Sequence, residues 1–167
     1  MLLLMLLVFV AGCKKKEIPD GGMSVMMTDA PANFLKVNVE ITGFEVNHES
    51  KGWISLPVKQ GVYNLLDLQN NVSVVLTDHA DLPVGKINQI RLILGTNNSV
   101  QDKENQFPLT IPSGAETGLK LNIDQVIVSR QNLDLLIDFD ANASIVQEGN
   151  GTYSLKPVLK IKSIGRS

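Results

Sequence analysis

The chain has 167 residues, 44% hydrophobic and 19% charged, which is the composition of a single globular domain rather than of a disordered or fibrous protein. The net charge is −2 and aromatic residues make up 5%, which argues against nucleic acid as a partner, because phosphate binding needs clustered cations and base binding needs aromatic platforms. Two His and one Cys exclude most metal centres and nucleophile–base pairs by number alone, so we expect no cofactor.

Residues 1–12 form an uncharged apolar run, which predicts a signal peptide. The run is too short to span a bilayer as a helix and has none of the polar positions of a helix in a globular core. No Lys or Arg precedes it, although signal peptides normally begin with positive charge, which leaves open a start codon further upstream.

Val10, Ala11 and Gly12, directly before Cys13, resemble the lipobox of bacterial lipoproteins. In that family the peptide is cut before the cysteine, which then carries the lipid. The resemblance implies signal-peptidase recognition at these three residues and lipid attachment at Cys13. A single cysteine in an exported protein needs such a reason, since it has no internal disulfide partner; a buried free cysteine is the alternative.

Residues 13–22 are expected to form a lipidated tether, because Pro19, Gly21 and Gly22 interrupt a polar segment. Fully extended, the part after Cys13 reaches at most about 30 Å, so the domain is expected to stay close to its membrane. Lys14, Lys15 and Lys16 would favour anionic headgroups or serve only as a solvated spacer. The expected location is the bacterial cell envelope, most simply the outer membrane, on its periplasmic or surface face.

Residues 23–167 are predicted to form one all-β domain, a Greek-key-type β-sandwich of roughly seven to nine strands. The clearest signal is the period-two alternation of Leu35, Val37, Val39 and Ile41 with polar residues, and Gly43 marks a bulge or bend in that strand. Further strands are predicted at 25–27, 52–56, 62–68, 72–76, 87–94, 107–111, 119–123, 133–139 and along a closing strand from 153 to 164.

Three local features qualify this pattern. Asn70-Asn71 is a turn signal, which predicts a hairpin between the strands at 62–68 and 72–76. The stretch 60–69 is the one place where a helical turn competes with a strand. Pro157 in the closing strand predicts an edge or a bulge.

A series of short stretches along residues 23–164 carries a resemblance to a known family. The stretches are Met27–Pro31, Gly52-Trp53, Asn64–Leu68, Leu82-Pro83, Gln89–Leu92, Pro112–Gly114, Thr117–Leu121, Asp138–Ala141, Ser144–Val146 and Tyr153–Val158. They resemble the bacterial lipoprotein domain family catalogued as the domain of unknown function number four-three-eight-two. The resemblance implies a sandwich similar to transthyretin-like and carboxypeptidase-regulatory domains, and it implies no particular biochemical role. Lys86-Ile87 departs from the family, which often has an aromatic residue there.

Asp138, Asp140 and Asn142 are the weak candidates for a metal site. On a continuous strand they would share one face, where their oxygens could converge on a hard cation such as Ca²⁺. An EF-hand loop needs Gly and Glu where this sequence has Ala143 and Gly149, so that motif fails. The alternative is a solvated strand face or capping of the following turn, and we expect no essential metal here.

The remaining polar residues receive structural interpretations first. Asp29 lies ahead of a proline, which is typical of an Asx-turn, with ligand binding as the alternative. His48 and His79 have no partners at ligand spacing and are predicted to lie at the surface. The lysines at 156, 160 and 162 favour a protected edge strand.

Function is predicted by elimination. There is no nucleophile elbow, phosphate loop or dinucleotide fingerprint, which favours a non-catalytic binding or assembly module over an enzyme. The polar connections 96–106 and 112–117 offer side chains suited to a glycan, a peptide or an envelope protein, or are merely solvated loops. The alternatives are a carboxylate-dependent hydrolase and a structural, fimbria-like subunit. The weak ligand-binding candidates are Asn97, Asn98, Ser113 and Thr117.

Overall fold

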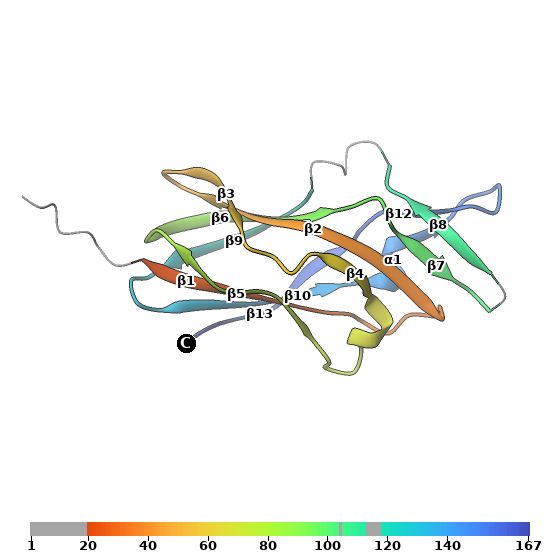
Figure 1. The fold of residues 1–167 in the computed structure, drawn as a ribbon, viewed down its shortest axis with the longest axis horizontal. Helices are drawn as coiled ribbons and strands as arrows, with labels where there is room; N and C mark the ends of the chain where they lie inside the picture. The colour runs from red at the N-terminus through yellow and green to blue at the C-terminus, as the bar shows by residue number, and fades with distance from the viewer. Residues whose placement is uncertain (1–19, 104, 113–117) are drawn as a thin grey trace, which may run out of the picture.

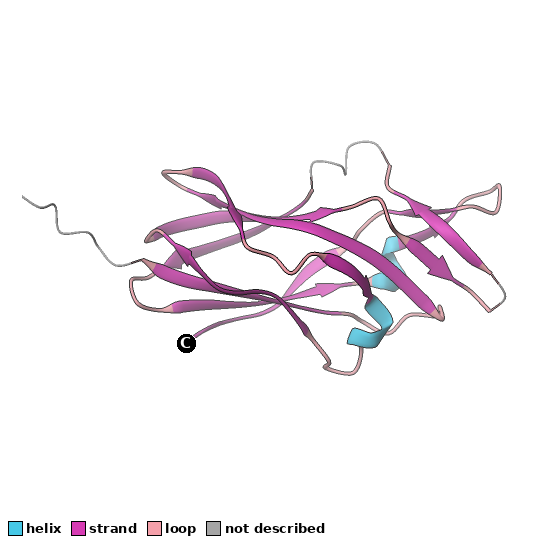
Figure 2. Cartoon of the chain, in the orientation of Figure 1, coloured by secondary structure: helices cyan, strands magenta, loops and turns pink. Residues whose placement is uncertain are grey.

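The computed structural model describes residues 20–103, 105–112 and 118–167. This part of the chain folds into two facing β-sheets with two helices of four residues each (Figures 1 and 2). The predicted all-β sandwich is therefore confirmed. The described residues form thirteen strands rather than seven to nine, in part because the predicted closing strand is divided into two and two strands of three residues were not predicted.

The smaller sheet has four strands, and its two central strands are β1 (Gly21–Thr28) and β10 (Asn132–Phe139). β1 lies between β10, to which it is parallel, and β5, to which it is antiparallel. A parallel pair was not expected from the antiparallel pattern of a Greek key. The order is β13 (Leu159–Arg166), β10 (Asn132–Phe139), β1 (Gly21–Thr28) and β5 (Val74–Leu82).

The larger sheet is organised around β2 (Lys36–His48), which pairs with four other strands. β3 (Gly52–Leu56) and β4 (Gly61–Asn64) lie along one of its sides. The other side continues through β6 (Gly85–Leu94) to β9 (Leu119–Ile127), and through β7 (Ser99–Gln101) to β8 (Gln106–Thr110), β12 (Tyr153–Leu155) and β11 (Ile145–Gln147).

The bulge predicted at Gly43 is confirmed. The pairing of β2 with β6 shifts between Ile41 and Gly43. Before the shift the odd-numbered residues are buried, as at Val39 and Ile41; after it the even-numbered residues are buried, as at Phe44 and Val46. A bulge inserts one residue and so reverses which side chains face the core. Glu45 and Asn47 consequently face the outside of the sandwich.

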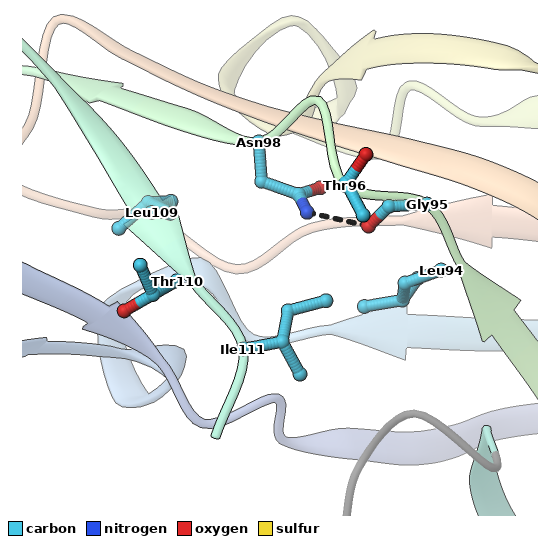
Figure 3. A pocket seen from close by; sticks show the side chains of 7 residues that line it. All are labelled: Leu94, Gly95, Thr96, Asn98, Leu109, Thr110 and Ile111. Atoms are coloured by element: carbon cyan, nitrogen blue, oxygen red, sulfur yellow. Dashed lines mark hydrogen bonds between the residues drawn. The ribbon is translucent and has the colours of Figure 1, made fainter. Parts of the chain in front are cut away.

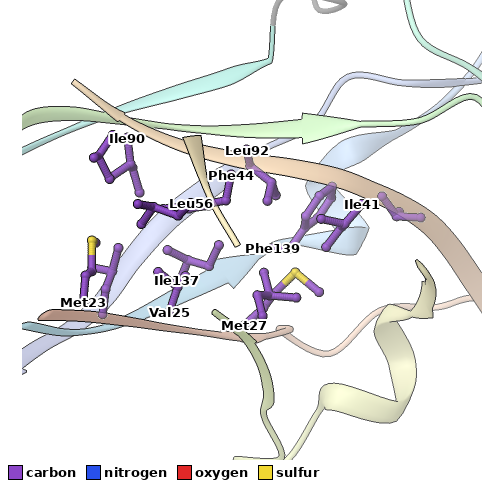
Figure 4. Close-up of a cluster of buried hydrophobic side chains, with 14 of the residues drawn as sticks. Met23, Val25, Met27, Ile41, Phe44, Leu56, Ile90, Leu92, Ile137 and Phe139 are labelled. Carbon is purple, nitrogen blue, oxygen red and sulfur yellow. The ribbon is translucent and has the colours of Figure 1, made fainter. Parts of the chain in front are cut away.

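The core lies between the two sheets (Figure 4). β1 and β10 contribute side chains that are fully buried, and the larger sheet meets them with apolar residues of β2, β3 and β6. Burial of such side chains contributes about 1.5–3 kcal/mol each relative to exposure, which makes this cluster the main stabilising feature. The labelled members are Met23, Val25, Met27, Ile41, Phe44, Leu56, Ile90, Leu92, Ile137 and Phe139.

The predicted hairpin at Asn70-Asn71 is wrong. Both residues have positive φ, 57° and 67°, as a turn requires, but β4 pairs with β2 and β5 with β1, so the connection crosses from one sheet to the other. The helical turn considered in this stretch is present as the 3-10 helix η1 (Leu65–Leu68).

The predicted closing strand is also divided. β12 belongs to the larger sheet and β13 to the smaller one, with Pro157 between them. Proline lacks the N–H that a ladder needs, so the chain changes sheets here instead of continuing one strand. β7 and β11 were missed because three residues are too few to display an alternation.

Candidate functional site

A pocket of about 390 Å³ opens where β6 ends beside the end of β8 (Figure 3). This volume falls within the range of small-ligand sites. The predicted polar connection at 96–106 therefore does border a cavity, although part of it forms β7. The lining residues are Leu94, Gly95, Thr96, Asn98, Leu109, Thr110 and Ile111.

A closed set of hydrogen bonds holds the loop between β6 and β7 against β2. Gly95 N donates to the carbonyl of Glu40 at 2.9 Å, and Asn97 N donates to the Glu40 carboxylate at 2.9 Å. The side chain of Asn98 accepts from Glu40 N at 2.8 Å and donates to the carbonyl of Gly95 at 2.7 Å. One wall of the pocket is thus fixed by the protein itself.

This network gives Asn98, a weak ligand-binding candidate from the sequence, a structural role instead. The residue is 4% exposed, and both polar atoms of its amide are bonded to the backbone. Asn97 is exposed, with its N–H held by Glu40. Ser113 and Thr117 lie outside the described residues. Of the weak candidates that the structure describes, Asn97 alone is exposed near the pocket.

Gly95 is required for this arrangement, since a β-carbon there would overlap the Glu40 carboxylate. Gly95→Ala is expected to displace that carboxylate, leave Asn97 N without its acceptor and lower the free energy of unfolding by about 1–2 kcal/mol. Urea denaturation measures the change. Gly149→Ala is the control, because nothing lies within 4 Å of a β-carbon at Gly149; a loss there as large as at Gly95 would contradict the role of the network.

The surface that lines the pocket is mainly apolar, with hydroxyl groups at its edge. Leu94 and Ile111 are half-buried, and Leu109 is buried. Thr96 and Thr110 are exposed, and no other described residue hydrogen-bonds to either hydroxyl. None of the described lining residues titrates, so they offer no general acid or base.

The three residues weighed for a metal site do not converge. β10 ends at Phe139 and the helix α1 (Ala141–Ser144) begins after Asp140, so the strand face they were expected to share does not exist. Asn142 is exposed on α1, and Asp138 keeps one buried carboxylate oxygen without a hydrogen bond within the described part of the chain. Across the described ranges, no three His, Cys, Asp or Glu side chains are arranged to hold a metal ion.

Asp140 is instead the N-cap of α1. One carboxylate oxygen accepts from Ala143 N at 2.9 Å and the other from Lys160 Nζ at 2.7 Å. The hydrogen bond from Lys160, followed by that from Ala143 N, lowers the pKa of the Asp140 carboxyl below its ordinary value near 3.8. This is the capping alternative that the sequence left open.

Asp140→Ala is expected to lower the free energy of unfolding by about 1–2 kcal/mol through loss of the cap. Asp140→Asn keeps an acceptor for Ala143 N and should cost less. Because the native pKa is lowered, the carboxylate stabilises the fold above pH 3.8, and this contribution is lost as the pH falls through the native pKa. Denaturation curves at several pH values test this; equal stability of the alanine and asparagine variants at pH 7 would contradict it.

A family model described as "Domain of unknown function (DUF4382)" matches residues 20–157. The chain belongs to this family. The DUF4382 match runs from β1 through β12 and includes the whole pocket, whereas β13 follows its end. Comparison with the curated proteins and with the solved structures finds no match. Among the described residues, no helix has the length and apolar character needed to cross a membrane.

Asp29 of the DUF4382 domain is 3% exposed and joins three elements. Its carboxylate accepts from Ala141 N at 2.9 Å and from Gln69 Nε2 at 3.3 Å, which ties the end of β1 to α1 and to the end of η1. Burial, and secondarily the charge of Asp138, raises the pKa of Asp29 above its ordinary value near 3.8. These contacts assign it a structural role.

The predictions for the basic residues had mixed outcomes. His48 was placed at the surface but is 2% exposed, with Nδ1 accepting from Ser50 N at 3.2 Å, because β2 places it on the core side after the bulge. His79 is exposed as predicted. Lys160 and Lys162 lie on β13, an edge strand as predicted, and Lys156 lies in the connection before it.

Sequence reasoning missed a second feature, on the outer face of the larger sheet. Trp53 lies there against Arg91, which pairs with Glu45. The available signal was a single tryptophan in a short strand, but its neighbours depend on strand register that the sequence does not reveal.

Proposed function

We propose that the chain is a lipid-anchored protein of the bacterial envelope whose role is binding without catalysis. Its ligand is an apolar side chain presented by a peptide segment or an envelope protein, received in the pocket between β6 and β8. The uncharged run at 1–12 and the lipobox-like residues before Cys13 support the anchor. The location we propose is the outer membrane, on its periplasmic or surface face.

The observation that carries the binding role is the combination of a fixed wall with an apolar floor. The bonds among Glu40, Gly95 and Asn98 join protein groups to one another and fix the loop beside the pocket, so we expect little ordering of this loop on binding. Leu94, Leu109 and Ile111 favour an apolar group, and the two threonine hydroxyls at the edge suit the polar backbone on either side of a peptide's side chain. None of the described residues that line the pocket has a side chain that could act as a general acid or base, which favours binding over hydrolysis.

Strand addition is less well supported. β13 is an edge strand on which Ile164 is 38% exposed, but Lys160 and Lys162 lie along it. Lysine on an edge opposes pairing with another chain. Binding at the pocket is therefore better supported than strand addition at β13.

Cys13→Ser tests the anchor. In a lipoprotein-competent host, the unchanged chain should incorporate labelled palmitate and fractionate with membranes, and the variant should lose both, because serine lacks the thiol that accepts the lipid. Label retained by the variant would contradict lipidation at Cys13.

A displayed peptide library selected on the purified chain tests the pocket. We expect enriched peptides to share an apolar residue, and Thr110→Trp, which fills the mouth from an exposed position, to weaken their binding at least about tenfold. Ser163→Trp, exposed on β13 of the other sheet, is the matched control. Absence of enrichment, equal effects of the two substitutions, or cleavage of a bound peptide would contradict the proposal.

A further inference from the structure

We propose that the outer face of the larger sheet, over β3, β2, β6 and β9, binds an acidic saccharide. Trp53 supplies the platform for a pyranose ring, the neighbouring amides bond to hydroxyls, and Lys120 pairs with a carboxylate of the sugar. This surface is separate from the β6–β8 pocket, so the inference does not depend on the function proposed above.

Strand register places two rows of polar side chains across this face. In the first row, Ser55 lies beside Glu45, Glu45 beside Arg91, and Arg91 beside Lys120. In the second, Trp53 lies beside Asn47, Asn47 beside Gln89, and Gln89 beside Asn122. The residues between them on β2 and β6, such as Val46 and Ile90, are buried. Alternation along the strands therefore turns all eight side chains outward.

Trp53 is held in place by a cation beneath it. The guanidinium carbon of Arg91 lies 4.4 Å from the centroid of the indole, and Arg91 also pairs with the Glu45 carboxylate. The Arg91 side chain is only 20% exposed, because the indole and Glu45 cover it. The guanidinium occupies one face of the ring and fixes its position, while Trp53 as a whole is only half-buried. A fixed, half-exposed aromatic ring is suited to stacking against an apolar ring face.

The backbone immediately before β9 lies close to the Arg91 side chain. Gly118, with φ of +88°, starts the segment that leads into β9, and a β-carbon there would lie 2.5 Å from Cγ of Arg91. Only glycine combines this φ with the close approach. Arg91 is therefore confined between Trp53, Glu45 and the start of β9.

The charge of the face points to an anionic ligand. Glu45 neutralises Arg91, whereas Lys120, exposed and 5.9 Å from the indole centroid, has no ion pair with any described residue. The amides of Gln89 and Asn122 hydrogen-bond to each other at 2.8 Å and keep further donors and acceptors for hydroxyl groups. An aromatic platform, adjoining amides and a lysine without a carboxylate partner among the described residues match a pyranose chain that carries carboxylates.

Calorimetric titration of the full chain with tetragalacturonate and with the neutral maltotetraose tests the proposal. We expect the acidic tetrasaccharide to bind about tenfold more tightly, and the difference to shrink with added salt. Trp53→Ala should weaken binding of the acidic sugar at least about tenfold, and Trp53→Tyr, which keeps an aromatic platform and guards against misfolding of the alanine variant, should restore most of it.

Lys120→Gln should reduce the affinity for tetragalacturonate to that for maltotetraose and leave the neutral sugar unaffected, whereas Lys162→Gln on β13 should change neither. Thr110→Trp, which blocks the pocket, should leave saccharide binding intact, so the two proposals fail separately. Absence of binding, binding insensitive to Trp53→Ala and Trp53→Tyr alike, or equal loss with Lys162→Gln would overturn the saccharide site.

Discussion

Phe139→Ala is expected to lower the free energy of unfolding by about 3–5 kcal/mol. Phe139 is fully buried at the end of β10, among the core side chains drawn in Figure 4. Its removal takes away apolar contact and leaves a cavity that the two sheets cannot close without shifting. Because a domain of this size is stabilised by only about 5–15 kcal/mol, the variant should be close to unfolding at 37 °C.

Urea denaturation followed by circular dichroism measures this loss. Ile164→Ala on the neighbouring strand β13 is the control, since that side chain is 38% exposed and should contribute much less. A loss below about 1 kcal/mol for Phe139→Ala would contradict the assignment of this residue to the core.

Asp29→Ala should lower the free energy of unfolding by about 2–3 kcal/mol, because it removes two hydrogen bonds to a carboxylate and leaves the buried Ala141 N without an acceptor. Asp29→Asn keeps an acceptor for that N–H and should cost less. The measurement is again urea denaturation, and equal losses for both variants would contradict the role of the Ala141 hydrogen bond.

The same pair of variants also tests a pH dependence. Since burial raises the native pKa of Asp29 above 3.8, the folded chain holds more protons than the unfolded chain between the two pKa values. This group's contribution therefore falls as the pH rises through that interval. Asp29→Asn should remove that part of the slope, and an unchanged slope would contradict the raised pKa.

The alternation of apolar and polar residues was sufficient to predict most strands, because a half-buried strand imposes a period of two whatever its partner. It placed β3 at 52–56 and the bulge at Gly43. It did not predict which strands pair. Asn70-Asn71 forms a turn in either topology, and only the long-range partners of β4 and β5 show that the chain changes sheets there.

The candidate site was predicted less well, for a related reason. A polar loop at 96–98 indicates exposure, but the side chain of Asn98 accepts a hydrogen bond from the backbone N–H of Glu40, 58 residues earlier in the chain. The platform at Trp53 depends on register across four strands, which sets Arg91 and Lys120 near the indole. Contacts between residues so far apart in the chain cannot be predicted from the local sequence. A helix cap such as Asp140 can be, because its partner Ala143 is only three residues away.

Site-specific photocrosslinking in living bacteria tests the proposed binding role most directly. A benzoylphenylalanine residue at Thr110 places the reactive group at the mouth of the pocket, and the same residue at Ser163 places it on the other sheet. We expect a light-dependent adduct with a discrete envelope partner at position 110 and none at 163. No adduct at 110, or the same adduct from both positions, would contradict the pocket as the binding site.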